Sequence, residues 1–181
     1  MTQYMRLTRE LVLRLGADNL TTLHWWVDGS CAIHDDMKGH TGGALSMGKG
    51  VIYGTSTRQK LNTRSSTEEE LVAVDDCMAQ VLWTKYFLAA QGYETSAHVI
   101  LQDNESAIRL ETNGHKSMGQ RSRHIEIRYF FITDQVNKGN VIIEYCPTDE
   151  MEGDYMSKAL QGSKFGKFQS SIMNNQDSAK S

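Results

Sequence analysis

Short apolar runs separated by glycine-containing turns occupy the first third of the chain and predict β-strands. The first run, Leu23–Asp28, contains Trp and Val, which favour strands, and Gly29-Ser30 follows it as a turn signal. Two further runs, Gly43–Met47 and Val51–Ser56, are separated only by Gly48-Lys49-Gly50. We therefore predict three strands in an antiparallel meander.

Helical and strand patterns then alternate along the chain. Three Glu residues follow the hydroxyl-rich start at Ser65, and apolar residues recur at helical spacing from Leu71 to Leu82, which predicts a long helix ending at Gly92. The continuous apolar run His98–Gln102 predicts a strand that is buried on both faces.

Four shorter elements are expected after this strand. They are a helix from Asn104 to Leu110, a helix from Ile125 to Val136 that ends at Gly139, a strand Val141–Tyr145 and a helix Glu150–Leu160. The order β-β-β-α-β-α-α-β-α predicts an α/β fold whose five-stranded mixed sheet, an antiparallel meander plus parallel strands, is flanked by helices.

The chain divides into three parts by composition. Its 181 residues fit one domain, for which we expect residues 21–162. Residues 1–20 end in the linker-like stretch Gly16-Ala17-Asp18-Asn19 and look detached from the rest. Residues 163–181 are small and polar, so we expect a flexible C-terminal tail.

Composition excludes several classes of protein. No apolar run approaches the roughly 18 residues that a membrane span needs, so no membrane partner is expected, and the N-terminus is too polar for a signal peptide. The three Cys are far apart, which favours neither a zinc site nor a disulfide framework and indicates a reducing, intracellular compartment. The net charge of −3 disfavours nucleic-acid binding by bulk electrostatics alone.

Four carboxylates fall where strand ends and helix starts converge in a mixed sheet. Asp28 and Asp103 each end a predicted strand, Glu70 lies in the first turn of the long helix, and Asp154 lies near the start of the last one. Each has a structural alternative. The Asp residues could be turn formers or could compensate a helix dipole.

Glu70 could also be the capping partner of Thr67, unless Ser66 is the cap and Glu69 takes that role.

Gathered carboxylates repel one another and cannot all remain ionised without cations. Hard divalent cations such as Mg²⁺ relieve this repulsion. Two such ions about 3.5–4 Å apart clamp the attacking and leaving oxygens of a phosphoryl transfer. The four acids therefore predict a site for two Mg²⁺ ions, with Mn²⁺ as a substitute.

Several strings resemble known motifs. VDGSC from Val27, EEL from Glu69, QDNESA from Gln102 and GDYMSKAL from Gly153 resemble the four motifs of ribonuclease H. HDDMKGHTGG, STRQKLNTRSSTEEEL, RHIEIRYFFI and EYCPTDE resemble the ribonuclease H domain of copia-like LTR retrotransposon polyproteins. The resemblance covers roughly residues 20–162.

The resemblance implies a ribonuclease H-like fold and an endonuclease that cuts the RNA strand of RNA–DNA hybrids, leaving a 3′-hydroxyl and a 5′-phosphate. It implies that Asp28 bridges both metal ions, that Glu70, Asp103 and Asp154 complete their shells, and that Glu70 senses the ribose 2′-hydroxyl. Residues 1–20 resemble the connection after a reverse transcriptase domain, which would be a partner from the same polyprotein. Such a protein is expected in cytoplasmic virus-like particles or in the nucleus.

The sequence also departs from the family. Many ribonucleases H carry a His after the fifth strand, whereas here Pro147 follows, and His124 belongs to the preceding predicted helix. Gly153 stands where the family's last motif usually has Ala. Since Gly weakens helices, Asp154 is expected to be held loosely.

Basic residues cluster despite the negative net charge. Exposed loops could explain them, but phosphate contacts on both sides of a cleft are the functional interpretation, and such contacts would bind without reading bases. The candidates for nucleic-acid binding are Arg58, Lys60, Arg64, Ser65, Asn104, Arg121 and Arg123.

Two rival functions remain open. A transposase or integrase could use the same kind of fold, but these enzymes usually have three acids and a DNA-binding appendage that is not visible here. A degenerate domain could keep the fold, bind nucleic acid and cleave it weakly or not at all, or could need a reverse transcriptase partner.

Overall fold

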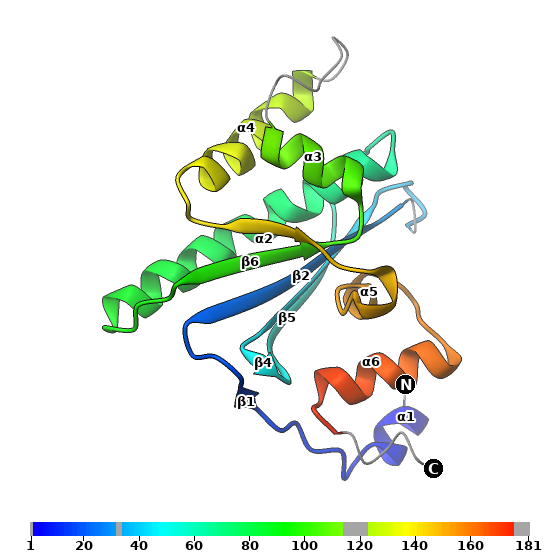
Figure 1. The fold of residues 1–181 in the computed structure, drawn as a ribbon. Coiled ribbons are helices and arrows are strands. Elements are labelled where there is room, and N and C mark those ends of the chain that lie inside the picture. The colour runs from blue at the N-terminus through cyan, green and yellow to red at the C-terminus, as the bar shows by residue number, and fades with distance from the viewer. Residues whose placement is uncertain (1, 32–33, 114–122, 176–181) are drawn as a thin grey trace.

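A computed structural model describes residues 2–31, 34–113 and 123–175 (Figure 1). The central sheet has five strands in the order β5-β3-β2-β6-β7. Strands β2, β3 and β5 pair antiparallel, whereas β6 pairs parallel with β2 and β7 pairs parallel with β6. This confirms the predicted mixed sheet. The strands are β2 (Thr22–Ser30), β3 (His40–Ser46), β5 (Val51–Arg58), β6 (Ala97–Gln102) and β7 (Ile142–Tyr145).

Helices cover both faces of the sheet (Figure 1). One face carries α2 (Ser66–Ala90), α3 (Glu105–Asn113) and α4 (Arg123–Asn137). The other carries α5 (Asp154–Ser157) and α6 (Gly162–Ile172). A short helix, α1 (Thr2–Leu7), and a two-stranded sheet of β1 (Gly16–Ala17) and β4 (Gly48–Lys49) lie at the edge of the domain.

The alternation of side chains along β2 builds a core on each face. Leu23, Trp25 and Val27 point into the larger core, which α2 and α4 close. Trp26 points the other way and packs against a smaller cluster formed with α6. Asp28, two residues beyond Trp26, therefore belongs to the face that α5 covers.

The segment after residue 150 differs from the prediction. Instead of one helix Glu150–Leu160, the structure has a 3-10 turn, Thr148–Glu150, and the four-residue α5. The flexible tail was expected to begin at residue 163, but residues 163–172 belong to α6, because Phe168 and Ile172 recur at helical spacing and are buried against the sheet. The last six residues lie outside the described part of the chain.

The N-terminal residues also differ from the detached segment that the sequence suggested. Tyr4 of α1 contacts the ring of Phe165 edge-on at 5.9 Å between centroids, and its hydroxyl accepts a hydrogen bond from Gln169 at 2.5 Å. The backbone N–H of Arg14 donates to the carbonyl of Met173 at 3.1 Å. The two ends of the described chain therefore pack on each other.

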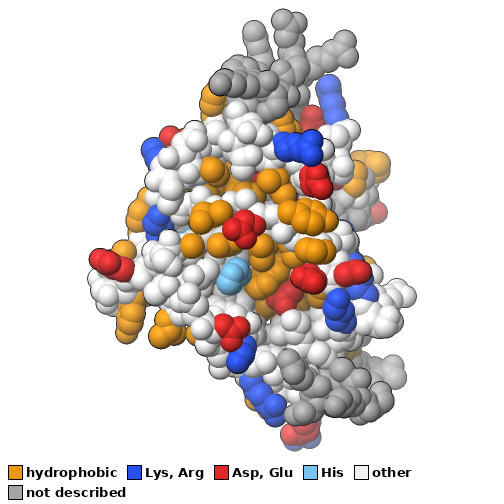
Figure 2. All heavy atoms as spheres, viewed as in Figure 1, with side chains coloured by type: hydrophobic (Ala, Val, Ile, Leu, Met, Phe, Trp, Pro, Cys, Tyr) orange, Lys and Arg blue, Asp and Glu red, His pale blue; other side chains and the backbone are white. Residues whose placement is uncertain are grey.

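The sheet edge at β7 is partly apolar. Figure 2 shows hydrophobic side chains gathered on the viewed face of the molecule, and Ile142 and Tyr145 of β7 are exposed. Within the described residues, no helix combines the length and apolar character needed to cross a membrane.

Candidate active site

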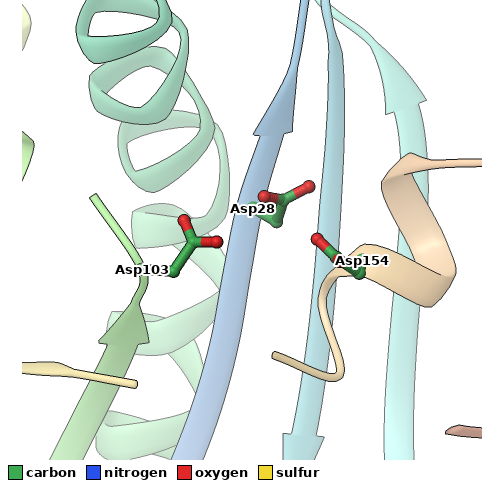
Figure 3. A group of neighbouring side chains, drawn as sticks. All are labelled: Asp28, Asp103 and Asp154. Carbon is green, nitrogen blue, oxygen red and sulfur yellow. The ribbon is translucent and has the colours of Figure 1, made fainter. Parts of the chain in front are cut away.

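The register of the sheet brings two of the predicted acids together. Trp26 of β2 lies opposite Leu101 of β6 in a parallel pair. Asp28 follows Trp26 by two residues and Asp103 follows Leu101 by two residues, so both carboxylates lie at the same end of the sheet. Asp154, from the start of α5, reaches them from the side (Figure 3). Carboxylate oxygens of these three residues lie within 4.8 Å of one another.

Two glycines allow helices to approach Asp28 from opposite faces. A Cβ at Gly29 would lie 2.7 Å from the backbone carbonyl oxygen of Glu69 in α2. A Cβ at Gly42, the β3 partner of Asp28, would lie 2.6 Å from the backbone nitrogen of Ser157 in α5. Any side chain at either position would push a carboxylate-bearing helix away from the strand end.

Glu70 is the fourth predicted acid and lies close enough to Asp28 and Asp103 to feel their charges. Its side chain is buried, and its Oε2 accepts a hydrogen bond from the backbone N–H of Gly29 at 3.1 Å. Glu70 falls outside the set of carboxylates within 4.8 Å. The charges of Asp28 and Asp103 nevertheless contribute to raising its pKa, so it belongs to the same electrostatic site.

The cap of α2 is not the one proposed from the sequence. Ser65 is the cap, and its hydroxyl accepts a hydrogen bond from the backbone N–H of Glu68 at 3.2 Å. The Glu68 carboxylate accepts in turn from the backbone N–H of Arg64 at 2.7 Å. Neither Glu69 nor Glu70 caps the helix, so Glu70 is available to the site.

Asp154 is fully buried and paired with two ammonium groups. Lys158 Nζ lies 2.5 Å from Asp154 Oδ1 and 3.1 Å from Asp28 Oδ1. Lys164 Nζ, from α6, lies 2.6 Å from Asp154 Oδ2. The expectation that Asp154 is held loosely is therefore wrong.

The physical reason lies at Gly153. This residue precedes α5 as its N-cap instead of interrupting the helix. A Cβ there would lie 3.1 Å from Asp28 Cβ, so the glycine lets α5 sit directly against the strand that carries Asp28.

Sequence reasoning assigned no role to Ser157, Lys158, Lys164 or Thr148. The Ser157 hydroxyl donates to Asp28 Oδ2, and the Thr148 hydroxyl donates to Asp103 Oδ2 at 2.8 Å. Ser157 and Lys158 follow Asp154 by three and four residues, a helical spacing that could have identified them. Nothing in the sequence pattern points to Lys164, which depends on α6 folding back.

Burial and mutual repulsion make the site unfavourable for anions alone. Burial raises the pKa of Glu70 well above its ordinary value, and the charges of Asp28 and Asp103 raise it further. Burial also raises the pKa of Asp28 to about 6, although Lys158 opposes this shift. A divalent cation would offset the burial and the repulsion that raise the pKa values of Glu70 and Asp28, and the all-oxygen donor set fits a hard ion such as Mg²⁺ or Mn²⁺.

The predicted basic residues lie partly at the same end of the sheet. Arg58 ends β5 level with the end of β2, because His40 of β3 is the register partner of both Arg58 and Ser30. The Arg58 guanidinium forms an exposed ion pair with Asp36 at 3.4 Å. Lys60 and Arg64 are exposed between β5 and α2.

Other predicted binding residues have structural roles or are not described. The Asn104 side-chain oxygen accepts from the backbone N–H groups of Ser106 and Ala107, both at 3.1 Å, and so caps α3. Arg121 lies outside the described residues. Arg123 begins α4, but its side chain is outside the described part of the structure.

Comparison with known proteins gives the sequence relationship. No protein-family model matches the chain. The retrovirus-related Pol polyprotein from transposon TNT 1-94 of Nicotiana tabacum is 30% identical over 131 residues, which cover 72% of this chain. The corresponding polyprotein from transposon RE1 of Arabidopsis thaliana is 31% identical over 156 residues, or 85% of this chain.

The chain is a relative of transposon Pol polyproteins. It spans about 10% of the length of each of these two relatives. The predicted relationship to retrotransposon polyproteins is thereby confirmed.

Solved structures show the fold of this Pol relative. LC11-RNase H1, isolated from compost by a metagenomic approach, is 12% identical with a TM-score of 0.53, over 71% of this chain and 86% of that chain. The prototype foamy virus protease-reverse transcriptase is 12% identical with a TM-score of 0.50, over 90% of this chain and 22% of that chain. The Pol relative therefore has the predicted ribonuclease H-like fold.

A second structure of LC11-RNase H1, in complex with an RNA/DNA hybrid, has a TM-score of 0.51 at 11% identity, over 71% of this chain and 88% of that chain.

Proposed function

We propose that this chain is the ribonuclease H domain of a copia-like retrotransposon polyprotein and hydrolyses the RNA strand of RNA–DNA hybrids. The observation that carries the proposal is the meeting of Asp28, Asp103 and Asp154 at one end of a ribonuclease H-like sheet, with Glu70 beside them. The hybrid complex of LC11-RNase H1 supports this choice of substrate.

The four acids would hold two Mg²⁺ or Mn²⁺ ions, with Asp28 as the ligand common to both. When bound, such ions activate a water molecule and stabilise the leaving oxygen of the phosphodiester. The chain's own residues keep the ligands in place. The Ser157 hydroxyl fixes Asp28, the Thr148 hydroxyl fixes Asp103, and the Gly29 N–H fixes Glu70.

Substrate discrimination is assigned to Glu70, which would accept a hydrogen bond from the ribose 2′-hydroxyl and so distinguish RNA from DNA. Arg58, Lys60 and Arg64 would contact phosphates beside the site. Because phosphate contacts carry no base information, binding would be insensitive to sequence and sensitive to salt.

A reverse transcriptase domain of the same polyprotein is the proposed partner. The similarity to the foamy virus protease-reverse transcriptase and the small fraction of the Pol relatives that this chain spans both support it. Cytoplasmic virus-like particles are the proposed location.

The decisive experiment is cleavage of an end-labelled RNA strand in an RNA–DNA hybrid with Mg²⁺ or Mn²⁺. Single-stranded and double-stranded RNA serve as substrate controls. We expect cleavage of the hybrid alone, at least about 100-fold slower in Asp103→Asn because that variant loses a metal ligand. Asp134→Asn, a change on α4 of a carboxylate that pairs with Lys138 just beyond that helix, should cleave like the unchanged protein.

If the folded protein cleaves no hybrid with either metal, the hypothesis that this chain is active by itself is rejected. Adding the reverse transcriptase domain would then separate an incomplete enzyme from a domain that only binds nucleic acid.

A further inference from the structure

Lys158 occupies an unusual position between two buried acids. Its Nζ bridges Asp28 Oδ1 at 3.1 Å and Asp154 Oδ1 at 2.5 Å, and both carboxylates are almost fully buried. An ammonium group therefore lies in the gap that separates the two acids, where a cation shared by them would lie. The other side of Asp28, which faces Glu70 and Asp103, has no ammonium within ion-pair distance of either of those acids among the described residues.

The formal charges of the site favour a single divalent ion in the absence of substrate. The four carboxylates of the site share two ammonium groups, from Lys158 and Lys164, which contact Asp28 and Asp154. When all four acids are ionised, two negative charges remain unmatched, which is the charge of one Mg²⁺. A second ion beside Lys158 would be repelled by that ammonium group.

We propose that Lys158 is a positioning residue that holds the gap between Asp28 and Asp154 as a built-in cation. The free protein then binds one divalent ion, on the side of Asp28, Glu70 and Asp103. The second ion enters when Lys158 leaves the gap, as the phosphate of a bound substrate adds negative charge. This inference rests on the proposed metal-dependent hydrolysis and specifies the order in which its ions bind.

The surroundings of Lys158 permit this movement. Its side chain is 37% exposed, and it lies immediately after α5 on extended backbone. Lys164 contacts the opposite oxygen of Asp154 from α6. Asp154 therefore keeps one ammonium partner when Lys158 moves away, so the buried carboxylate is never left without a counter-charge.

The test counts bound ions in the full chain without nucleic acid. Mn²⁺ binding is followed by electron paramagnetic resonance, and Mg²⁺ binding by calorimetry. We expect one ion in the unchanged protein. We expect a second ion in Lys158→Gln, or binding that is about tenfold tighter overall. Lys158→Arg keeps the charge and should restore the binding of one ion.

Lys167→Gln is the matched control, because it removes one positive charge from α6 without removing a partner of the acids. The Lys167 ammonium donates to the backbone carbonyl of Asp149 and lies 5.9 Å from the centre of the Phe168 ring. It should bind one ion. Circular dichroism establishes that each variant is folded, and Lys158→Met replaces Lys158→Gln if the latter is not.

Two equivalent ions in the unchanged protein would overturn the inference, as would identical binding by the unchanged protein and Lys158→Gln, including no binding by either. Binding by Lys158→Gln alone would also overturn it, because the unchanged protein is expected to bind one ion. Hybrid cleavage with unaltered ion binding would leave the proposed function in place and remove only the role of Lys158. The expected ion counts in a protein that cleaves no hybrid would leave the role of Lys158 in place and remove the proposed function.

Discussion

Glu70 of α2 accepts a hydrogen bond from the backbone N–H of Gly29, at the end of β2. This contact ties the N-terminal part of α2 to the strand that carries Asp28. It depends on the absence of a side chain at Gly29, because a Cβ there would come within 2.8 Å of the Glu69 carbonyl group. One missing methyl group thus determines where a proposed metal ligand lies.

Replacing this glycine should damage both stability and activity. Gly29→Ala is expected to cost about 1–3 kcal/mol of unfolding free energy, the usual range for overpacking, and to reduce hybrid cleavage by displacing Glu70. Urea unfolding and the cleavage assay measure the two effects. Gly166→Ala is the control, because a Cβ at Gly166 in α6 meets nothing within 4 Å. Equal stability of the two variants would contradict this account.

Glu111 of α3 should make the stability of the protein depend on pH. Burial raises the pKa of this carboxyl well above its ordinary value of 4.5, so the folded chain holds the proton more tightly than the unfolded chain. The contribution of this group is fully present below pH 4.5 and is lost as the pH rises toward the folded-state pKa.

Glu111→Gln should therefore gain stability relative to the unchanged protein between about pH 4 and about pH 8, by about 1 kcal/mol or more. Urea unfolding at the two pH values measures this difference. Glu105→Gln, on the exposed side of the same helix, should show almost no pH-dependent difference. A parallel pH dependence for Glu111→Gln and the unchanged protein would show that Glu111 is not the group responsible.

Divalent ions should stabilise the folded chain through Asp28. Mg²⁺ at about 100 times its dissociation constant is expected to add about 2.7 kcal/mol of unfolding free energy. Asp28→Asn should lose most of that gain, because it removes the ligand shared by the site. Asp134→Asn should keep it. Thermal melts with and without Mg²⁺ make the comparison, and equal shifts in all three proteins would argue against a metal site at Asp28.

Exposed basic residues beside the site should set the salt dependence of hybrid binding. Lys60→Ala is expected to weaken binding to hybrids of different sequence by similar factors. It should also reduce the slope of log affinity against log salt by about one. Lys138→Ala, just beyond the C-terminal end of α4 and paired with Asp134, should change neither quantity. Fluorescence anisotropy at several salt concentrations measures both, and an unchanged slope for Lys60→Ala would exclude the phosphate contact.

The end of β6 could be predicted from the sequence because the Asp103-Asn104 turn follows its apolar run directly. The sequence also predicts a turn at Gly29-Ser30, but both residues continue β2 and pair with β3. The parallel register of β2 and β6 places Asp28 beside Asp103 all the same. The start of α2 was less certain, because Ser65, Ser66 and Thr67 are all acceptable caps. Only the position of Glu68 relative to Ser65 in the structure decides between them.

The region after Pro147 could not be predicted because its stability comes from distant contacts. Residues 162–172 are rich in Gly, Ser and Lys, and their helix is stabilised by Phe168 packing on a cluster that includes Ala44 and Val51. Lys164 reaches Asp154 through the same folding back, whereas Lys158 pairs with Asp154 at a local i,i+4 spacing. Sequence patterns identified the four acids, but one of their two counter-charges depended on tertiary structure.

The N-terminal segment packs on α6, and α6 carries a counter-charge of the acidic site, so the ends of the chain affect the charge of that site. Arg14 bonds to Met173 just beyond α6, and α6 presents Lys164 to Asp154. A domain trimmed to residues 21–162 would keep the sheet and all four acids, yet it would lack Lys164 and leave Asp154 with Lys158 alone. Trimming would thus change the charge of the site without touching any of its acids, and ions measured on such a fragment would describe a different site.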